Sequence, residues 1–370
     1  MKSPLVNRAM LGQVPRIVVK IGSSSLTMPD GTLNNGALVR LSEALSKAHG
    51  RGQQVVLISS GATSLGIGPL GLSGRPRDIS THQAAAMVGQ SRLMARYAAE
   101  FAKADITVGQ VLLTATDVVN RRHYANVQNA LSSLLALGVI PIVNENDAVV
   151  TDELRFGDND RLAALVSHLV AADALIFLTD VDGLYTAPPR VKGAQRISEV
   201  TSTDMLDQLE ITGRGSDIGT GGMRTKVDAA GLACSGGVPV LLTSAENLAA
   251  ALAGEEVGTW FPITGKRSSA RRLWLEHAAL VRGQIIVDAG AAAALRKGGA
   301  SLLPVGVIAV AGKFAPGDLV EIVELGGQPL ARGLSGFASE ELMRLAGDKT
   351  EARGMRPAVH INDLVRIKRK

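Results

Sequence analysis

Cysteine is almost absent from this sequence of 370 residues, because Cys234 is the only one. It lies in the apolar helical pattern VDAAGLACSG and has no second thiol with which to form a disulfide or a CxxC metal site. We therefore expect a small core side chain and a reducing compartment. The six histidines show no metal-ligand spacing either, so no site in which protein side chains alone hold a metal is expected.

Long hydrophobic runs are absent as well. No stretch reaches the roughly 18 apolar residues that a membrane-spanning helix needs. Residues 1–15 also lack the apolar segment of a secretory signal. These two absences predict a cytoplasmic protein with no membrane partner.

Aromatic residues are scarce, at 3% of the chain, although 46% of it is hydrophobic. The core must then consist of Ala, Val, Leu and Ile, which is typical of buried parallel strands and their covering helices. Strand-like runs alternate with helical stretches through the first 255 residues and begin at residues 16, 54, 106, 139, 174 and 238. This alternation predicts an α/β fold, a three-layer αβα sandwich with a mostly parallel central sheet. Functional residues should lie at the carboxyl ends of its strands.

The character of the sequence changes near residue 258. A charged, helix-poor stretch is followed by short strand-like runs that begin at residues 283, 306, 318 and 329. We predict an N-terminal lead of unknown role over 1–15, an α/β domain over 16–257, a linker over 258–282 and a small β-rich domain over 283–370.

Positive charge is concentrated in the last part of the chain. Residues 1–263 hold 22 Lys and Arg against 24 Asp and Glu, whereas residues 264–370 hold 17 against 10. An acidic partner such as RNA could bind this basic part, with a solvated surface as the alternative. Phe314 and Phe337 are the only aromatic residues after the linker, which argues against base stacking. Nucleic acid is therefore the less favoured partner.

Three clusters of small residues follow the predicted strands. VVKIGSSSL places Lys20 before Gly22, LISSGATSLG places Ser60 beside Gly61, and GTGGMRTKVDAA opens a helix with Lys226 one turn in. Glycines let backbone N–H groups approach an anion, and a helix N-terminus adds a favourable dipole. Taken alone, each loop is better explained by an ordinary tight turn, and none matches a Walker P-loop or a Rossmann fingerprint. Lysines beside glycines at strand-to-helix junctions favour phosphate binding.

The stretch FGDND places Asp158, Asn159 and Asp160 directly before an apolar helix. One such side chain is enough to cap a helix, so three indicate a further role. A carboxylate acceptor is already anionic at neutral pH and needs no general base, but it must approach a polyanionic γ-phosphate. Two lysines, Mg²⁺ and an aspartate that positions the lysines would meet that need, and Asp160 is the candidate aspartate. Asn159 and Asp147, in NENDAV, could instead bind the amino and carboxylate groups of an amino acid.

Taken together, these motifs resemble those of the amino acid kinase family. Lys20, ISSGA, NENDAV, FGDND, LTDVDGLY and GTGGMRTK occur in this order, and the β-rich C-terminal part resembles a PUA domain. The resemblance is closest to family members that act on glutamate. It implies ATP-dependent phosphorylation of the γ-carboxylate of L-glutamate to L-glutamyl 5-phosphate, the first step of proline biosynthesis. It also implies feedback inhibition by L-proline and a homo-oligomer, either a dimer or a tetramer.

The same resemblance implies roles for individual residues. Lys20 and Lys226 would contact the phosphates of ATP, and Asp160 would organise the two lysines. The residues implied to bind glutamate are Ser60, Gly61, Asp147, Asp158 and Asn159. The residues implied to bind the nucleotide are Lys20, Thr179, Asp180, Thr220, Gly221, Gly222, Met223, Arg224, Thr225 and Lys226.

A different substrate within the same family is the main alternative enzyme function. Acetylglutamate, aspartate or a nucleoside monophosphate would be the acceptor. The C-terminal module disfavours these substrates, because aspartate kinases resemble this region less and carry ACT-type regulatory modules.

Overall fold

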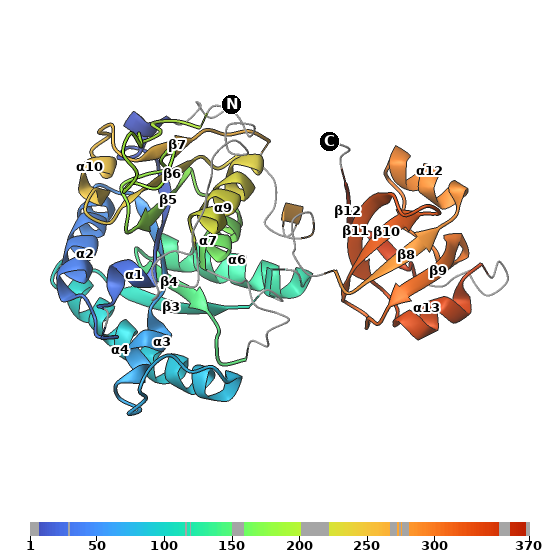
Figure 1. Ribbon diagram of the computed structural model, residues 1–370, viewed down its shortest axis with the longest axis horizontal. Coiled ribbons are helices and arrows are strands. Elements are labelled where there is room, and N and C mark those ends of the chain that lie inside the picture. Colours follow the sequence, from blue (N-terminus) through green and yellow to red (C-terminus); the bar gives the residue numbers. More distant parts are fainter. Residues whose placement is uncertain are drawn as a thin grey trace. The chain divides into compact units, whose positions relative to one another are not determined.

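The chain forms two compact units, Met1–Ala270 and Arg271–Lys370, and each has its own hydrophobic core (Figure 1). The computed structural model describes residues 7–28, 30–114, 117–118, 120–149, 159–200, 222–266, 272–273, 275, 281–347 and 356–367. Among these residues, every helix lacks the combination of length and hydropathy needed to cross a bilayer.

A seven-stranded sheet forms the centre of the first unit, with the strand order β3-β4-β2-β1-β5-β6-β7. All neighbouring strands are parallel except β6 and β7. The strand order reverses beside β1, and such a reversal makes the crevice at the carboxyl ends the usual ligand site. The strands are β1 (Arg16–Ile21), β2 (Gln54–Ser59), β3 (Val108–Leu113), β4 (Ile140–Glu145), β5 (Ala174–Thr179), β6 (Val240–Ser244) and β7 (Thr259–Phe261).

Helices cover both faces of this sheet, which confirms the predicted αβα sandwich. One face carries α2, α4 and α10, and the other carries α6, α7 and α9 (Figure 1). The longer helices are α2 (Asn35–Gly50), α4 (Ile79–Ala102), α6 (Arg121–Ala136), α7 (Asn159–Leu169) and α9 (Met223–Ser235). The shorter ones are η1 (Arg8–Met10), α1 (Ser23–Leu26), α3 (Ala62–Ile67) and α10 (Leu248–Leu252).

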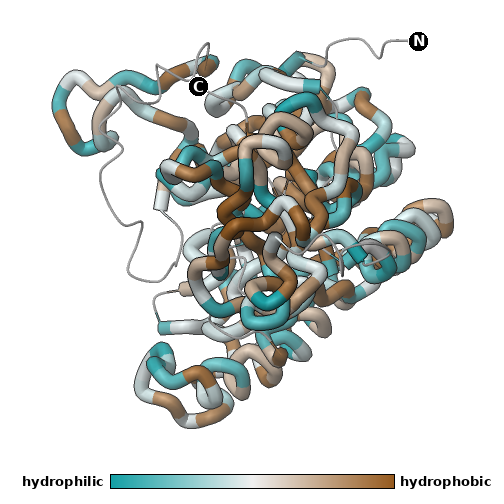
Figure 2. Tube along the Cα trace, turned by 90° about the vertical axis from the view of Figure 1, so that its right-hand side faces the viewer, coloured by the Kyte–Doolittle hydropathy of each residue, from teal (hydrophilic) through white to brown (hydrophobic). Residues whose placement is uncertain are grey.

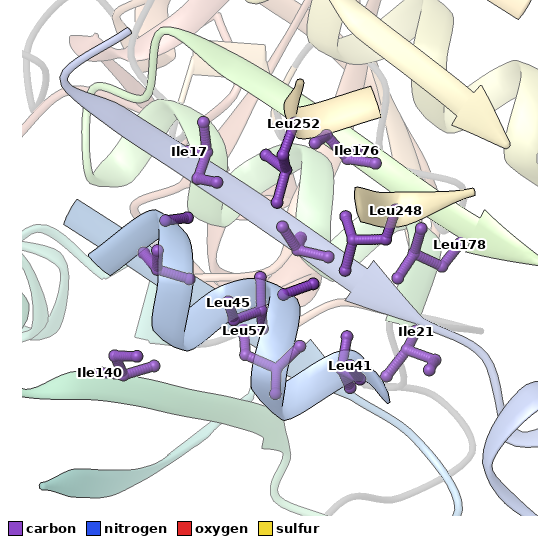
Figure 3. Close-up of a cluster of buried hydrophobic side chains, with 14 of the residues drawn as sticks. Ile17, Ile21, Leu41, Leu45, Leu57, Ile140, Ile176, Leu178, Leu248 and Leu252 are labelled. Atoms are coloured by element: carbon purple, nitrogen blue, oxygen red, sulfur yellow. The ribbon is translucent and has the colours of Figure 1, made fainter. Parts of the chain in front are cut away.

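Alternation along β1 decides which of its side chains face the core and which face the site. Ile17, Val19 and Ile21 belong to the hydrophobic cluster shared with α2, α4 and α10 (Figure 3). Because successive side chains of a strand point to opposite faces, Val18 and Lys20 point toward α7. The central strands are also the most hydrophobic part of the trace in Figure 2, as expected for a sheet buried on both faces.

The first unit extends beyond the predicted α/β domain at both ends. The linker predicted over 258–282 differs from the structure at its start, because Thr259–Phe261 forms β7 and pairs antiparallel with β6. In the N-terminal lead, Leu11 and Val14 are buried in the core. The Gln53 side-chain amide donates to the carbonyl oxygens of both residues, at 2.9 and 2.8 Å. Leu11 and Val14 of the lead and Trp260 of β7 all belong to the hydrophobic core of the first unit.

The second unit is a five-stranded sheet with the strand order β12-β11-β10-β8-β9. Its strands are β8 (Gly283–Val287), β9 (Val307–Gly312), β10 (Leu319–Glu324), β11 (Pro329–Ser335) and β12 (Val359–Arg366). The helical elements are α12 (Ala289–Lys297), η2 (Pro304–Gly306) and α13 (Ser339–Leu345). This confirms the predicted β-rich character.

Candidate active site

Two lysines meet at one buried aspartate at the carboxyl edge of the first sheet. Lys20 Nζ, from β1, lies 2.6 Å from Asp160 Oδ1, and Lys226 Nζ, from α9, lies 3.2 Å from Asp160 Oδ2. The three side chains are 5%, 10% and 0% exposed, in the order Lys20, Lys226 and Asp160. The predicted convergence of the two lysines on this aspartate is confirmed. We call these three residues the lysine–aspartate group.

The charges of this group determine its chemistry. Burial opposes ionisation of Asp160, but the neighbouring ammonium groups of Lys20 and Lys226 outweigh that effect and lower the pKa of the carboxyl. Asp160 is therefore an anion at neutral pH. Two cations and one anion leave the group with a formal charge of +1 in a site with little solvent. Such a site attracts a further anion.

Local sequence explains how each member reaches the same point. Lys20 lies on the α7 side of β1 because of strand alternation. Asp160 occupies the first turn of α7, where a carboxylate is favoured by the helix dipole. Lys226 lies in the first turn of α9, next to Thr225, whose hydroxyl donates to the Gly222 carbonyl at 2.9 Å. The Thr225 hydroxyl also lies 3.4 Å from Asp160 Oδ2.

A second cluster of polar groups lies directly beside Asp160. Asn159 Nδ2 donates to the Ser60 hydroxyl at 2.9 Å, to the Ser59 carbonyl at 3.0 Å and to Asn144 Oδ1 at 2.8 Å. The structure thus brings the predicted residues Ser60 and Asn159 together. Gly61 follows with a φ of +97°, a left-handed conformation that favours glycine and lets the chain turn into α3.

Asp147 lies in the turn that follows β4, close in sequence to Asn144. This turn is closed by a hydrogen bond from the Val149 N–H to the Asn146 carbonyl, at 3.2 Å. The Asp147 side chain is half-buried. Because β4 and β2 are parallel neighbours, this turn and Ser60 lie at the same edge of the sheet.

Other predicted nucleotide-binding residues occupy neighbouring positions. Thr179 ends β5, the parallel neighbour of β1, and its hydroxyl donates to Asp180 Oδ1 at 2.8 Å. Met223 opens α9 and is partly exposed. Arg224 points outward and pairs with Asp228 of its own helix, at 3.3 Å. The predicted residues Asp158, Thr220 and Gly221 lie outside the described residues.

Two residues of the polar cluster were not identified from the sequence. Asn144 lies within NENDAV, where only Asp147 was selected. Gln90 of α4 accepts a hydrogen bond from Asn144 Nδ2 at 2.9 Å. The signal was a single polar residue on the apolar face of a helix, where Leu93 and Tyr97 are also buried.

The fold and the lysine–aspartate group define an α/β enzyme with a cationic site suited to phosphate groups. Comparison with known proteins gives the particular family. The model of the amino acid kinase family matches residues 15–244, and the model of the PUA domain matches residues 283–352. The chain belongs to the amino acid kinase family, and its second unit contains a PUA domain.

Curated relatives match the chain over nearly its whole length. The glutamate 5-kinase of Streptomyces coelicolor is 50% identical, over 97% of this chain and 98% of the relative. The glutamate 5-kinase of Frankia casuarinae is 52% identical over the same shares. The glutamate 5-kinase of Thermobifida fusca is 48% identical, over 97% of this chain and 95% of the relative.

Proposed function

We propose that this chain phosphorylates the γ-carboxylate of L-glutamate with ATP, giving L-glutamyl 5-phosphate and ADP, the first step of proline biosynthesis. The observation that carries the proposal is the buried pair of ammonium groups held by Asp160 at the carboxyl edge of the sheet. Relatives about half identical over 97% of the chain, all named glutamate 5-kinases, support glutamate as the acceptor.

The proposed chemistry needs charge compensation rather than a base. A glutamate carboxylate is ionised at neutral pH, so one of its oxygens can attack the γ-phosphorus directly. The new carboxylate–phosphorus bond forms while the bond to the oxygen bridging the β- and γ-phosphorus atoms breaks, and ADP leaves with that oxygen. Lys20 and Lys226 would offset the repulsion between the two anions. Because Asp160 fixes both ammonium groups in advance, little reorganisation is required.

The polar cluster beside Asp160 would bind the amino acid. Asn159 Nδ2 is engaged by protein acceptors, whereas Asn159 Oδ1 is buried and has no hydrogen-bond partner among the described residues. An acceptor oxygen of this kind suits the α-ammonium of glutamate. The site would be completed by Ser60 and Gly61, which follow β2, and by Asp147, which follows the neighbouring strand β4. Asp158 is proposed with them from its position in the sequence.

The nucleotide would occupy the side of the edge formed by β5 and α9. Lys20 and the first turn of α9, with Gly222, Met223, Thr225 and Lys226, would face its phosphates, and Arg224 would lie on the outer side of the same turn. Thr220 and Gly221 are proposed with them from their position in the sequence. Thr179 and Asp180 would adjoin its other end. Three or more His, Cys, Asp or Glu side chains do not gather anywhere among the described residues in a way that could hold a metal ion. Mg²⁺ would therefore be bound chiefly by the phosphates of ATP.

Three further properties are proposed on the strength of the family resemblance. L-Proline shares the amino and carboxylate groups of glutamate and would inhibit at or near the same site. The chain would form a homo-oligomer, either a dimer or a tetramer. A biosynthetic role that consumes ATP favours a cytoplasmic location.

An acceptor panel tests the proposed reaction. The purified protein is incubated with ATP, Mg²⁺ and either glutamate, acetylglutamate, aspartate or uridylate. ADP release is measured, and acyl phosphate is trapped with hydroxylamine as the hydroxamate. We expect ADP and hydroxamate with glutamate, at a kcat/KM well above that of the other acceptors. A higher kcat/KM with any other acceptor would refute the proposal. Adding proline to the glutamate reaction tests the inhibition separately.

Substrate binding and chemistry can be separated with Asp147→Ala. Because Asp147 is proposed to bind glutamate, this variant should raise the KM for glutamate more than the KM for ATP. Equal increases in both KM values would remove Asp147 from the proposed glutamate site.

A further inference from the structure

A chain of buried amide side chains crosses the carboxyl edge of the sheet. Gln90 Oε1, from α4, accepts from Asn144 Nδ2 at 2.9 Å, and Asn144 Oδ1 accepts from Asn159 Nδ2 at 2.8 Å. Gln90 is 8% exposed and Asn144 is 3% exposed. Because α4 and α7 cover opposite faces of the sheet, this amide relay connects the two helical layers around the end of β4.

The orientation of each amide follows from backbone groups that have only one hydrogen-bonding role. The Ser59 carbonyl can only accept, so Asn159 must turn its Nδ2 toward it, at 3.0 Å. The Glu145 N–H can only donate, so Asn144 must turn its Oδ1 toward it, at 2.9 Å. Asn144 Nδ2 then needs an acceptor on its other side, and Gln90 Oε1 is that acceptor. The hydrogen bonds of the relay therefore all donate in the same direction, from Asn159 through Asn144 to Gln90.

The two ends of the relay are chemically opposite. Asn159 Oδ1 ends it as an acceptor and Gln90 Nε2 ends it as a donor, and both atoms are buried without a partner among the described residues. Buried polar atoms rarely lack partners unless a site needs them. Aligned amide dipoles also polarise one another, so the relay strengthens the acceptor at Asn159 Oδ1.

The backbone of α4 is held firmly where Gln90 begins the relay. A Cβ on Gly89 would lie 1.7 Å from the Ala62 carbonyl oxygen, so α3 and α4 are in direct backbone contact. Two helical turns beyond Gln90, the Tyr97 hydroxyl lies 2.9 Å from the Ser59 hydroxyl. α4 therefore also contacts the end of β2. The carbonyl oxygen of Ser59, at that strand end, accepts the hydrogen bond from Asn159 Nδ2.

We propose that Gln90 is a positioning residue for the amino acid acceptor: through Asn144 it holds Asn159 Oδ1 in place for the ligand. The inference rests on the proposed function, in which Asn159 receives the ammonium group of the acceptor. Without Gln90, Asn144 Nδ2 would be left as a buried donor without an acceptor. Asn144 would shift to find another partner, and Asn159, which donates to Asn144 Oδ1, would move with it. Asn159 Oδ1 would then no longer be held in place for the ammonium group.

Four variants, one of them a control, test this role by steady-state kinetics. Gln90→Met keeps the length of the side chain but removes the acceptor oxygen. Gln90→Asn shortens the side chain by one methylene and moves the amide away from Asn144. It replaces Gln90→Met in the test if that variant fails to fold. Gln53→Met is the matched control, because Gln53 is also a buried glutamine, and its amide binds Leu11 and Val14 of the N-terminal lead. Thermal unfolding midpoints of all variants measure the purely structural effect.

A positioning role predicts a selective effect on the acceptor. Gln90→Met and Gln90→Asn should each raise the KM for glutamate about tenfold or more, the scale set by losing a hydrogen bond to a charged group. Their KM for ATP should stay within about twofold of wild type. Gln53→Met should lower the unfolding midpoint and leave both KM values unchanged. Gln90→Glu retains an acceptor oxygen and should restore most of the glutamate affinity.

Two outcomes would overturn the inference. One is a pair of Gln90 variants with an unchanged KM for glutamate, and the other is an equal rise in the KM values for glutamate and ATP. Failure of the proposed function looks different, because the wild type would then make no glutamyl phosphate. In that case the same comparison is run with the acceptor from the panel that the wild type does phosphorylate.

Discussion

Lys20 and Lys226 hold opposite oxygens of the same carboxylate, although one lies on the first strand and the other on a helix near the end of the first unit. Neither ammonium group can move without disturbing the position of the other, because Asp160 is shared. The pair therefore behaves as one preorganised cationic site, and its chemistry can be tested one charge at a time.

Removing either lysine should lower turnover far more than it alters the fold. We expect Lys20→Ala and Lys226→Ala each to reduce kcat for glutamyl phosphate formation by about 10²- to 10³-fold, the usual effect of losing one preorganised group. Lys103→Ala is the control, because Lys103 is 66% exposed and pairs with Glu100 on the surface of α4. Turnover equal to that of the control would exclude the tested lysine from stabilising the phosphoryl group.

Asp160 should make stability depend on pH in the acidic range. Its pKa in the folded chain lies below the reference value of 3.8, because two ammonium groups outweigh burial. The folded state therefore binds fewer protons than the unfolded state between the two pKa values, and stability falls as pH falls through that range. Asp160→Asn should be less stable than wild type by about 3–5 kcal/mol at pH 7, as expected when a buried ion pair loses one partner.

Urea unfolding at pH 7, 5 and 3 measures this difference. We expect a constant gap between wild type and Asp160→Asn at pH 7 and 5, and a smaller gap at pH 3, because wild-type Asp160 becomes protonated in the unfolded chain below pH 3.8. A gap of the same size at all three pH values would contradict the ionised state of Asp160.

Gly89 should tolerate no side chain. Because a Cβ there would lie 1.7 Å from the Ala62 carbonyl oxygen, Gly89→Ala requires α3 and α4 to separate. We expect a loss of about 1–3 kcal/mol in the free energy of unfolding, as for overpacked cores. Gly231→Ala in α9 is the matched control, since its Cβ meets no atom within 4 Å, and it should stabilise the helix by about 0.5–1 kcal/mol. Equal effects of the two substitutions would contradict the close contact.

Cys234 should be unreactive in the folded protein. Burial raises the pKa of its thiol to about 12, the side chain is 2% exposed, and its sulfur lies 3.3 Å from the Phe261 carbonyl oxygen. At pH 8 a disulfide reagent such as DTNB should detect no thiol in the native protein and one thiol per chain in urea. Rapid labelling of the native protein would show that α9 and β7 separate readily.

Sequence patterns predicted the sheet and the lysine–aspartate group because both depend on local rules. Alternation in RIVVKI places Lys20 opposite the core, and polar residues before an apolar helix place Asp160 at its first turn. Parallel strands then bring such positions to one edge.

The relay and the ends of the first unit could not be predicted in the same way. Gln90 comes from a helix far from any motif, and its partner Asn144 is reached only when α4 packs against the end of β4. TWF looked like part of a linker because a three-residue strand carries little periodicity, and it becomes β7 only through pairing with β6. These features depend on tertiary contacts rather than on local pattern.

The burial of Leu11 and Val14 in the N-terminal lead affects how the protein should be truncated. A recombinant chain started at Arg16, where the sheet begins, would lack Leu11 and Val14 and would leave the Gln53 amide without the two carbonyl groups that it binds. The gap would lie in the hydrophobic layer behind β1, the strand that carries Lys20. Affinity tags therefore belong upstream of this lead rather than in its place.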